Sequence, residues 1–365
     1  TGTYTVTWGS SLGASGYETA AFYSNPWLGD DVTGVLRGFE TRVEARSTGG
    51  MALSSSDQGG AEVDARVSEW LKNRNQEKPF FLFVNILEAH LPFELPEEFM
   101  ELSGIEPVEG AAISVDWAHR YNAGLNPPRW QDRDRIRDLY AADVCMADWL
   151  LTALLAQLEA EDLWDDAVVI VTSDHGENLG DHGLMDHQFG LYETLLAVPL
   201  VIRAPGRLPS GVRSDPVMLS DLYATIADAA GALEDSGANP ATTLLRSVFP
   251  DSRPVAAEYA GPQRGLLEKL KRFNPDLDTA ELATAYTTVR SGHLRLTVGS
   301  DGSRRLHDIS ADPGELNDIG VSGDREMASL LAMLPSEPLP TYGSSSANRL
   351  SPEARERLRA LGYVQ

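Results

Sequence analysis

The chain has 365 residues, of which 42% are hydrophobic and 23% are charged, and this composition is typical of a globular protein rather than a disordered one. It carries 54 acidic and 30 basic residues, so its formal net charge is −24. Because contacts with phosphates need lysine and arginine on one face, this acidic balance argues against nucleic acid as a partner and against docking on an anionic membrane.

The single cysteine, Cys145, excludes an intrachain disulfide framework and a cysteine-based zinc finger. We expect Cys145 to be a small buried residue. A chain without disulfides is compatible with the reducing cytoplasm, and we expect a cytoplasmic location. No run of about 18 uncharged apolar residues occurs, so no membrane segment is expected. The oligomeric state is left open.

Strands and helices alternate in the predicted structure from residue 17 to about residue 260. Residues 17–23 predict a short buried strand, which ends at the turn formers Ser24 to Pro26. Apolar residues on one face predict a helix over 61–74. The continuous apolar run 80–86 is typical of a strand buried on both faces, as in a parallel sheet.

The second part of this alternation contains two stretches without regular structure. Residues 91–130 are rich in proline and predict a long irregular connection. The other predicted elements are a helix at 131–160, a buried strand at 167–173, a polar loop at 174–190, a helix near 191–196, a strand at 198–203 and a helix that Ser220 caps.

The pattern changes after about residue 285, where short strands separated by glycine turns predict an antiparallel meander. A last helix is predicted from Ser351 to Gly362. The predicted fold class is therefore α/β, with a parallel sheet sandwiched by helices and a small C-terminal antiparallel sheet. We place the two domains at 1–260 and 261–365.

Histidines indicate where chemistry is expected. Three of the seven lie within thirteen residues, at His175, His182 and His187, directly after the predicted strand 167–173. Ligands of open α/β sheets bind outside the carboxyl ends of strands, so this position suits an active site. The adjacent Asp174 and His175 are suitable ligands for a divalent metal. The alternative is an Asp-capped helix start beside a surface histidine.

His90 is the second candidate, because it follows the predicted strand 80–86 and precedes a proline-containing turn. A histidine in this position can act as an acid, a base or an anion contact. The alternative is an ordinary histidine in a surface loop.

Four segments together resemble the sulfatase family of the alkaline phosphatase superfamily. They are the strand ending in His90-Leu-Pro-Phe93, the run 139–190 with Ser173-Asp-His-Gly-Glu177 and Gly180-Asp-His-Gly183, the segment from Tyr192-Glu193 to Pro205-Gly206, and Leu306-His-Asp-Ile followed by Asp312-Pro-Gly-Glu315. The resemblance implies an alkaline-phosphatase-like fold for most of residues 12–365.

The resemblance also implies roles for individual residues. Asp174 and His175 match the family's metal pair, and the metal is usually calcium, with magnesium, manganese or zinc as alternatives. His187 matches a Lys or His that contacts the sulfate, and His90 matches the histidine that contacts the ester oxygen and helps the leaving group depart. Glu177 and His182 lie inside the motif and are expected to orient these groups. Asn25, in the segment that replaces the family's Lys-x-His, is a candidate substrate contact, with a turn role as the alternative.

Two family features have no counterpart in this sequence: the first strand with its metal-binding aspartates, and the loop that supplies the nucleophile, a formylglycine made from Cys or Ser. Cys145 does not lie in the required pattern. We therefore expect that about a hundred N-terminal residues, the length of a strand, a loop and a helix, are missing.

The resemblance implies a hydrolase acting on sulfuric ester bonds through a covalent intermediate, with a small-molecule or glycan sulfate ester as substrate. One alternative is a phosphodiesterase, or a phosphoglycerol- or phosphoethanolamine-type transferase, of the same superfamily. The other is a truncated paralogue without catalytic activity.

Overall fold

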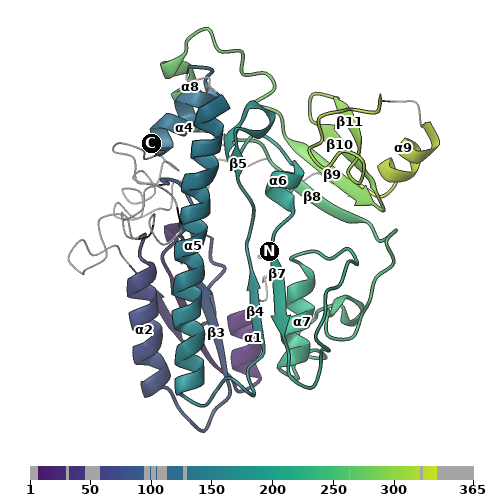
Figure 1. Cartoon of the computed structure of the whole chain (residues 1–365). Coiled ribbons are helices and arrows are strands. Elements are labelled where there is room, and N and C mark those ends of the chain that lie inside the picture. The colour runs from purple at the N-terminus through teal and green to yellow at the C-terminus, as the bar shows by residue number, and fades with distance from the viewer. Residues whose placement is uncertain are drawn as a thin grey trace, which may run out of the picture.

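The computed structural model places an α/β part beside a small C-terminal sheet (Figure 1). It describes residues 7–29, 33–45, 58–93, 99, 104, 113–125, 130–262, 264–320 and 324–334. The helix expected at 351–362 and most of the irregular stretch 91–130 lie outside these residues.

A three-stranded parallel sheet forms the first part of the α/β region. Its strands are β1 (Glu18–Tyr23), β2 (Thr41–Glu44) and β3 (Phe80–Asn85), in the order β2-β1-β3. The strands expected at 17–23 and 80–86 are thus confirmed within one residue. Asn25, directly after β1, caps the short 3-10 helix Pro26–Leu28 by accepting the Trp27 backbone N–H at 2.9 Å.

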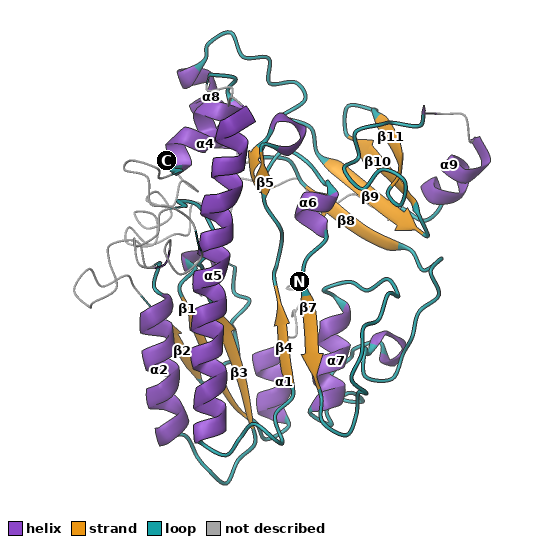
Figure 2. Cartoon of the chain, viewed as in Figure 1, coloured by secondary structure: helices purple, strands orange, loops and turns teal. Residues whose placement is uncertain are grey.

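Side chains alternate between the two faces of this sheet, as the two-residue period of a strand requires. Ala20 and Phe22 pack with the buried valines of α2 (Gly60–Asn73), on the face that α2 and α5 (Trp130–Ala160) cover. Ala21 and Tyr23 pack on the opposite face with Leu36 and Phe39. α1 (Trp8–Ala14) lies on that second face. Figure 2 shows α2 and α5 running side by side in front of the strands.

α5 is the longest helix and contributes to three hydrophobic clusters, through Ile136, Met146 and Leu158 among others. By length and composition, its residues Asp134–Ala160 could cross a membrane, a criterion that core helices of soluble proteins also meet. Cys145 lies on the side of α5 that faces solvent, so the expectation of a buried cysteine is wrong. The residues beside it explain this, because Val144 and Trp149 share its outward side while Met146 and Leu150 point inward.

The stretch 91–130 contains a helix that the proline-rich composition did not predict. α4 (Val115–Asn122) begins at Ser114, whose hydroxyl accepts the backbone N–H of Trp117 at 3.1 Å. Ala118 and Tyr121 lie one turn apart and enter the same core cluster as Leu139. Capping and an apolar face therefore stabilise a short helix in a stretch whose composition predicted none.

β4 (Val169–Thr172) and β7 (Leu200–Arg203) form a separate two-stranded sheet. The pair is antiparallel, whereas the sequence predicted parallel strands throughout. The chain between them reverses through short elements instead of crossing over along a long helix, and parallel pairing needs such a crossover. Within the described residues, β3 pairs with β1 and β4 pairs with β7. The elements of this connection are β5 (Asn178–Leu179), the 3-10 helix Asp181–Gly183, β6 (Met185–Asp186) and α6 (Glu193–Leu196).

α7 (Asp221–Ala229) follows β7 at the position predicted for a capped helix. The Ser220 side chain makes no capping hydrogen bond, so that detail of the prediction is wrong. The carboxylate of Asp221, the first residue of α7, reaches back to accept the Met218 backbone N–H ahead of the helix at 2.8 Å and pairs with Arg253 at 2.7 Å.

The C-terminal sheet is antiparallel, as predicted, with the order β11-β10-β9-β8. Its core is formed by Val289, Leu296 and Leu306 together with Met327 and Leu330 of the helix beside it. The division of the chain at residue 260 stays a prediction. The remaining elements are the 3-10 helix Pro240–Thr242, β8 (Val255–Tyr259), α8 (Arg264–Phe273), β9 (Tyr286–Ser291), β10 (Leu294–Gly299), β11 (Arg304–Asp308) and α9 (Asp324–Leu331).

Candidate active site

A pocket with about 500 Å³ of empty volume lies where β3 and β4 end. Two loops line most of it, one following each strand, and both run outward from the carboxyl ends of strands. The pocket is lined by Asn25, Asn85, Ile86, Leu87, Glu88, Ala89, His90, Tyr140, Ser173, Asp174, His175, Gly176 and Glu177.

Asp174 and His175 are held in place by bonds of their own loop. The Ser173 hydroxyl donates to the His175 carbonyl at 2.6 Å, and the Asp174 carboxylate accepts the His175 backbone N–H at 3.0 Å. Gly176 approaches α6 closely, because its N–H donates to the Leu195 carbonyl and a Cβ at this position would clash with the carbonyl of residue 194. A glycine is therefore needed directly after the Asp-His pair.

The ring of His175 has one nitrogen bonded within its own loop and the other near Asp174. Its Nδ1 lies 2.9 Å from the Gly176 carbonyl, which can only accept, so Nδ1 carries the hydrogen. Burial and the neighbouring His187 lower the pKa of His175, which favours the neutral ring with a free lone pair on Nε2. This Nε2 lies 3.8 Å from an Asp174 carboxylate oxygen. One carboxylate oxygen and one imidazole nitrogen fit part of the shell of a divalent cation.

His90 enters the pocket from the loop after β3. Its Nδ1 donates to the Leu91 carbonyl at 2.7 Å, and its own carbonyl accepts the side-chain amide of Gln58 at 2.7 Å. Burial and the nearby His187 lower the pKa of His90 to about 4, so the ring is neutral near pH 7.

His187 lies beside the pocket and contacts the histidines that line it. Its ring stacks on His175 with centroids 4.2 Å apart and lies 5.4 Å from the ring of His90. Its Nδ1 forms an ion pair with Asp186 at 2.7 Å and lies 3.9 Å from Glu177. Burial opposes a charge on His187, but the pairing with Asp186 and Glu177 raises its pKa well above the usual value.

Glu177, Asp186 and His187 are close enough together to hold a metal ion. The 2.7 Å contact between His187 and Asp186 is the distance of a charge-assisted pair, and the Asp186 pKa is lowered by His187 in spite of its burial. Burial raises the pKa of Glu177 to about 7. In this arrangement a protonated His187 lies between the two carboxyl groups.

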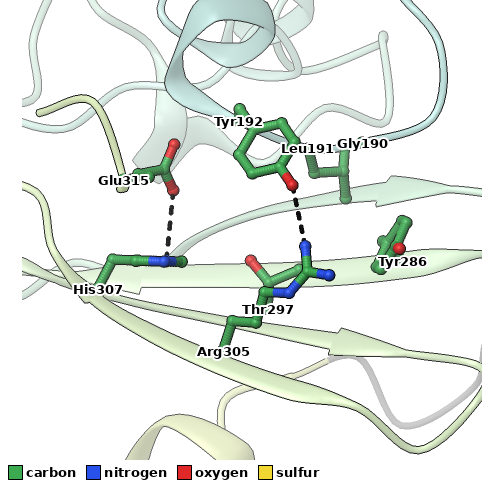
Figure 3. A pocket seen from close by; sticks show the side chains of 8 residues that line it. All are labelled: Gly190, Leu191, Tyr192, Tyr286, Thr297, Arg305, His307 and Glu315. Carbon is green, nitrogen blue, oxygen red and sulfur yellow. Dashed lines mark hydrogen bonds and ion pairs between the residues drawn. The ribbon is translucent and has the colours of Figure 1, made fainter. Parts of the chain in front are cut away.

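A second, smaller pocket of about 250 Å³ lies between the C-terminal sheet and residues 190–192 (Figure 3). The Tyr192 hydroxyl and the Arg305 guanidinium meet there at 2.9 Å, and His307 lies 3.8 Å from Glu315. The ring of His182 stacks on that of Tyr192, with centroids 3.5 Å apart. The contact of Tyr192 with Arg305 joins the sheet to the α/β part.

The structure thus brings together His90, Asp174, His175, Glu177 and Asn25 in one pocket, with His187 against its wall. His182 lies instead at the joint with the C-terminal sheet. Asn25 has a turn role, since its side chain caps a 3-10 helix. The roles assigned to these residues stay predictions.

Three residues at or beside the pocket were not predicted from the sequence: Asp186, Glu88 and Asn85. A signal for Asp186 was present, because the dipeptide Asp-His occurs three times between residues 174 and 187. Glu88 and Asn85 flank the strand end before His90 without a pattern of their own. Asn85 accepts the backbone N–H of Asn25 at 3.0 Å and so joins the ends of β1 and β3.

The fold and the pocket define an α/β protein with carboxylates and histidines gathered at strand ends. Residues 7–232 match the model of the family described as Sulfatase. The chain belongs to the sulfatase family.

Two curated relatives show how much of the family's length is present. A protein named Sulfatase from Formosa agariphila is 26% identical over 270 residues, which are 67% of this chain and 46% of that protein. Arylsulfatase K of Mus musculus is 26% identical over 278 residues, which are 69% of this chain and 48% of that protein. The chain spans about half the length of these relatives.

Solved structures support the predicted fold class. Phosphonate monoester hydrolase of Agrobacterium radiobacter superposes with a TM-score of 0.61 at 18% identity, over 89% of this chain and 80% of that chain. A protein in complex with its substrate D-glucosamine-2-N,6-O-disulfate superposes with a TM-score of 0.59 at 17% identity, over 97% of this chain and 82% of that chain. The α/β fold with a small C-terminal antiparallel sheet is confirmed.

Proposed function

We propose that the protein takes part in the hydrolysis of a sulfate ester at the pocket between the ends of β3 and β4, with a divalent metal. The observation that carries this proposal is the meeting of Asp174, His175 and His90 in one pocket, with His187 stacked against it. The family and the names of the two curated relatives support sulfate rather than phosphate as the transferred group.

Asp174 and His175 would hold the cation, for which the family resemblance favours calcium. A bound divalent cation neutralises the charge of the ester oxygens. His175 is prepared for this role because its Nδ1 hydrogen is committed to the Gly176 carbonyl, which leaves Nε2 on the side of Asp174. His187 would contact the anionic group, since the flanking carboxyl groups favour its protonated ring.

His90 would assist the departure of the leaving alcohol. The free protein holds its ring neutral, and an anionic group in the pocket would favour the protonated form. That form can donate a proton to the leaving oxygen. The nucleophile that attacks sulfur is assigned to none of the described residues, and the Cys/Ser-x-Pro-x-Arg pattern does not occur in this sequence.

The substrate class is a small or glycan sulfate ester. A related fold binds a disulfated glucosamine as its substrate, which supports a sulfated sugar of similar size. The net charge of −24 disfavours attraction of a long polyanion.

The test combines metal binding with hydrolysis of 4-nitrophenyl sulfate and of sulfated glucosamine. It uses the product of the full parent gene, because the nucleophile pattern does not occur in this sequence. We expect chelation by EDTA to abolish hydrolysis and added Ca²⁺ to restore it. Asp174→Asn and His90→Gln should each lower kcat/KM by about a hundredfold or more, and Asp174→Asn should weaken Ca²⁺ binding in calorimetry. Asp165→Asn, at a side chain that is 98% exposed, is the control and should change neither kcat/KM nor the affinity for Ca²⁺.

Two results would contradict this proposal. Faster hydrolysis of a phosphate or phosphonate ester than of the sulfate would favour phosphoryl-type chemistry, for which the structural likeness to a phosphonate monoester hydrolase is the precedent. Hydrolysis of neither ester by the product of the full parent gene would favour a non-catalytic protein. Reading the parent gene upstream of Thr1 for a Cys/Ser-x-Pro-x-Arg pattern tests the nucleophile separately.

A further inference from the structure

Asn122, in the last turn of α4, makes a two-point contact with the hairpin that carries His187. Its side-chain amide donates to the Met185 carbonyl at 2.9 Å, and its amide oxygen accepts the Met185 backbone N–H at 2.9 Å. Asn122 is 7% exposed and Met185 is fully buried. A side chain that both donates to and accepts from one residue reproduces the pairing of a neighbouring strand, so Asn122 gives β6 a partner on the side away from β5.

A second asparagine holds the next peptide of the hairpin. Asn178 lies opposite Asp186 in the β5–β6 register, and its side-chain amide donates to the Asp186 carbonyl at 3.0 Å. Its amide oxygen accepts the Thr194 hydroxyl at 2.7 Å, which ties the hairpin to α6. Buried amides therefore hold the carbonyls of two consecutive residues, Met185 and Asp186.

The hydrogen bonds of Asn122 and Asn178 lie next to or on a residue with an unusual backbone conformation, Asp186. Asp186 has a φ of 76°, in the left-handed region that is unfavourable for residues with a Cβ. In this conformation its carboxylate accepts the His187 backbone N–H at 2.6 Å and pairs with the His187 ring at 2.7 Å. The direction of the His187 ring therefore depends on the backbone of Asp186, which the two asparagines fix.

We propose that Asn122 is a positioning residue for His187, acting through Met185 and Asp186, and this inference rests on the proposed function. Asn122 is not among the residues that line the pocket. Its effect is carried by the hairpin to His187 and from there to His175, on which the ring of His187 stacks. The substrate's anionic group would meet these rings in an orientation that α4 determines.

The experiment uses two substitutions of Asn122 and a matched control in the full chain. Asn122→Ala removes both hydrogen bonds. Asn122→Asp keeps the shape and the bond from the Met185 N–H, but sets an oxygen against the Met185 carbonyl. Asn274→Ala is the control. The Asn274 side chain donates to the carbonyl of Ala123, the residue after Asn122, at 2.8 Å, and its amide oxygen accepts the Asp276 backbone N–H at 3.2 Å.

Three quantities are measured: the affinity for inorganic sulfate by calorimetry, the imidazole ¹⁵N resonances of His187 and His175, and the melting temperature. We expect both Asn122 variants to weaken sulfate binding by about tenfold, the lower end of what loss of an orienting partner costs. We also expect the His187 resonances to move. Asn274→Ala should leave the sulfate affinity and the resonances as in the unsubstituted protein.

The inference is overturned if both Asn122 variants leave the His187 resonances and the sulfate affinity unchanged. A lowered melting temperature would not rescue it, because substitution of a purely structural residue lowers the melting temperature alone. His187→Ala separates this from the proposed function. If His187→Ala leaves sulfate binding unchanged, the anion contact proposed for His187 is wrong, while the His187 resonances in the Asn122 variants still report on positioning.

Discussion

Asp143 illustrates how burial alters a single carboxyl group next to the pocket. It lies on the inner side of α5 and is 3% exposed, and its Oδ2 accepts no hydrogen bond from the described residues. Burial raises the pKa of Asp143 to about 8, and the buried carboxylate of Glu88 contributes in the same direction. Glu88 lines the pocket, so the charge of Asp143 is coupled to a residue of the pocket wall.

The folded-state pKa of Asp143 lies above its ordinary value of 3.8, so the unfolded chain loses this proton first as the pH rises. The stability that Asp143 contributes is fully present below about pH 4 and is lost as the pH rises through about 8. The Asp143→Asn variant lacks this loss. We therefore expect its free energy of unfolding, relative to that of the unsubstituted protein, to rise with pH across this range by up to about 1.4 kcal/mol per pH unit.

The measurement is the free energy of unfolding in urea at a series of pH values. Asp148→Asn, at an exposed position of the same helix, is the control and should keep the pH dependence of the unsubstituted protein. A variant at residue 143 with an unaltered pH dependence would show that Asp143 ionises normally in the folded protein.

At the scale of elements, the start of α2 is fitted tightly against α5. The Gly60 N–H donates to the Glu88 carboxylate at 3.0 Å, and a Cβ at this position would lie 2.5 Å from the same carboxylate and clash with Leu150. The absence of a side chain at Gly60 therefore sets how closely α2 approaches α5 and the loop after β3.

We expect Gly60→Ala to lower the free energy of unfolding by about 1–3 kcal/mol, because overpacking outweighs the better helix propensity of alanine. Gly13→Ala in α1 is the matched control. The nearest atom to a Cβ there is 3.9 Å away, so it should be neutral or stabilise by up to about 1 kcal/mol. Equal effects of the two substitutions on urea denaturation would refute the packing explanation.

At the scale of the whole molecule, a buried ion pair joins the C-terminal sheet to the α/β part. The Arg295 side chain, on β10, is 4% exposed and pairs with Glu193 of α6 and with Glu315. Glu315 also accepts the Glu193 backbone N–H at 2.6 Å. The turn after the sheet, the sheet itself and the start of α6 therefore meet in one charged cluster.

Removing the cation would leave the two carboxylates without their partner. We expect Arg295→Ala to cost about 3–5 kcal/mol in urea unfolding, the usual penalty for breaking one side of a buried pair. Arg304→Ala, at an exposed position of β11, should cost less than about 0.5 kcal/mol. Similar losses for both variants would show that the cluster does not hold the sheet in place.

The strands and helices themselves were largely predictable from the sequence. Short stretches of sequence are enough to recognise the apolar runs of β1, β3 and β4 and the periodic apolar face of α2. The adjacent Asp174 and His175 are recognisable in the same way. Local patterns of this kind specify an element because burial and periodicity act over one or two turns or a single strand.

Only the tertiary structure decided what these elements bring together. The contact of His90 with His187, the antiparallel pairing of β7 with β4 and the hydrogen bonds of Asn122 with Met185 all join residues that are far apart in the chain. Their partners are selected by the packing of whole helices and strands, which no local pattern encodes. The sequence by itself therefore determined the family, the order of elements and most candidate site residues, while three-dimensional packing decided how the histidines face one another and which residues hold them.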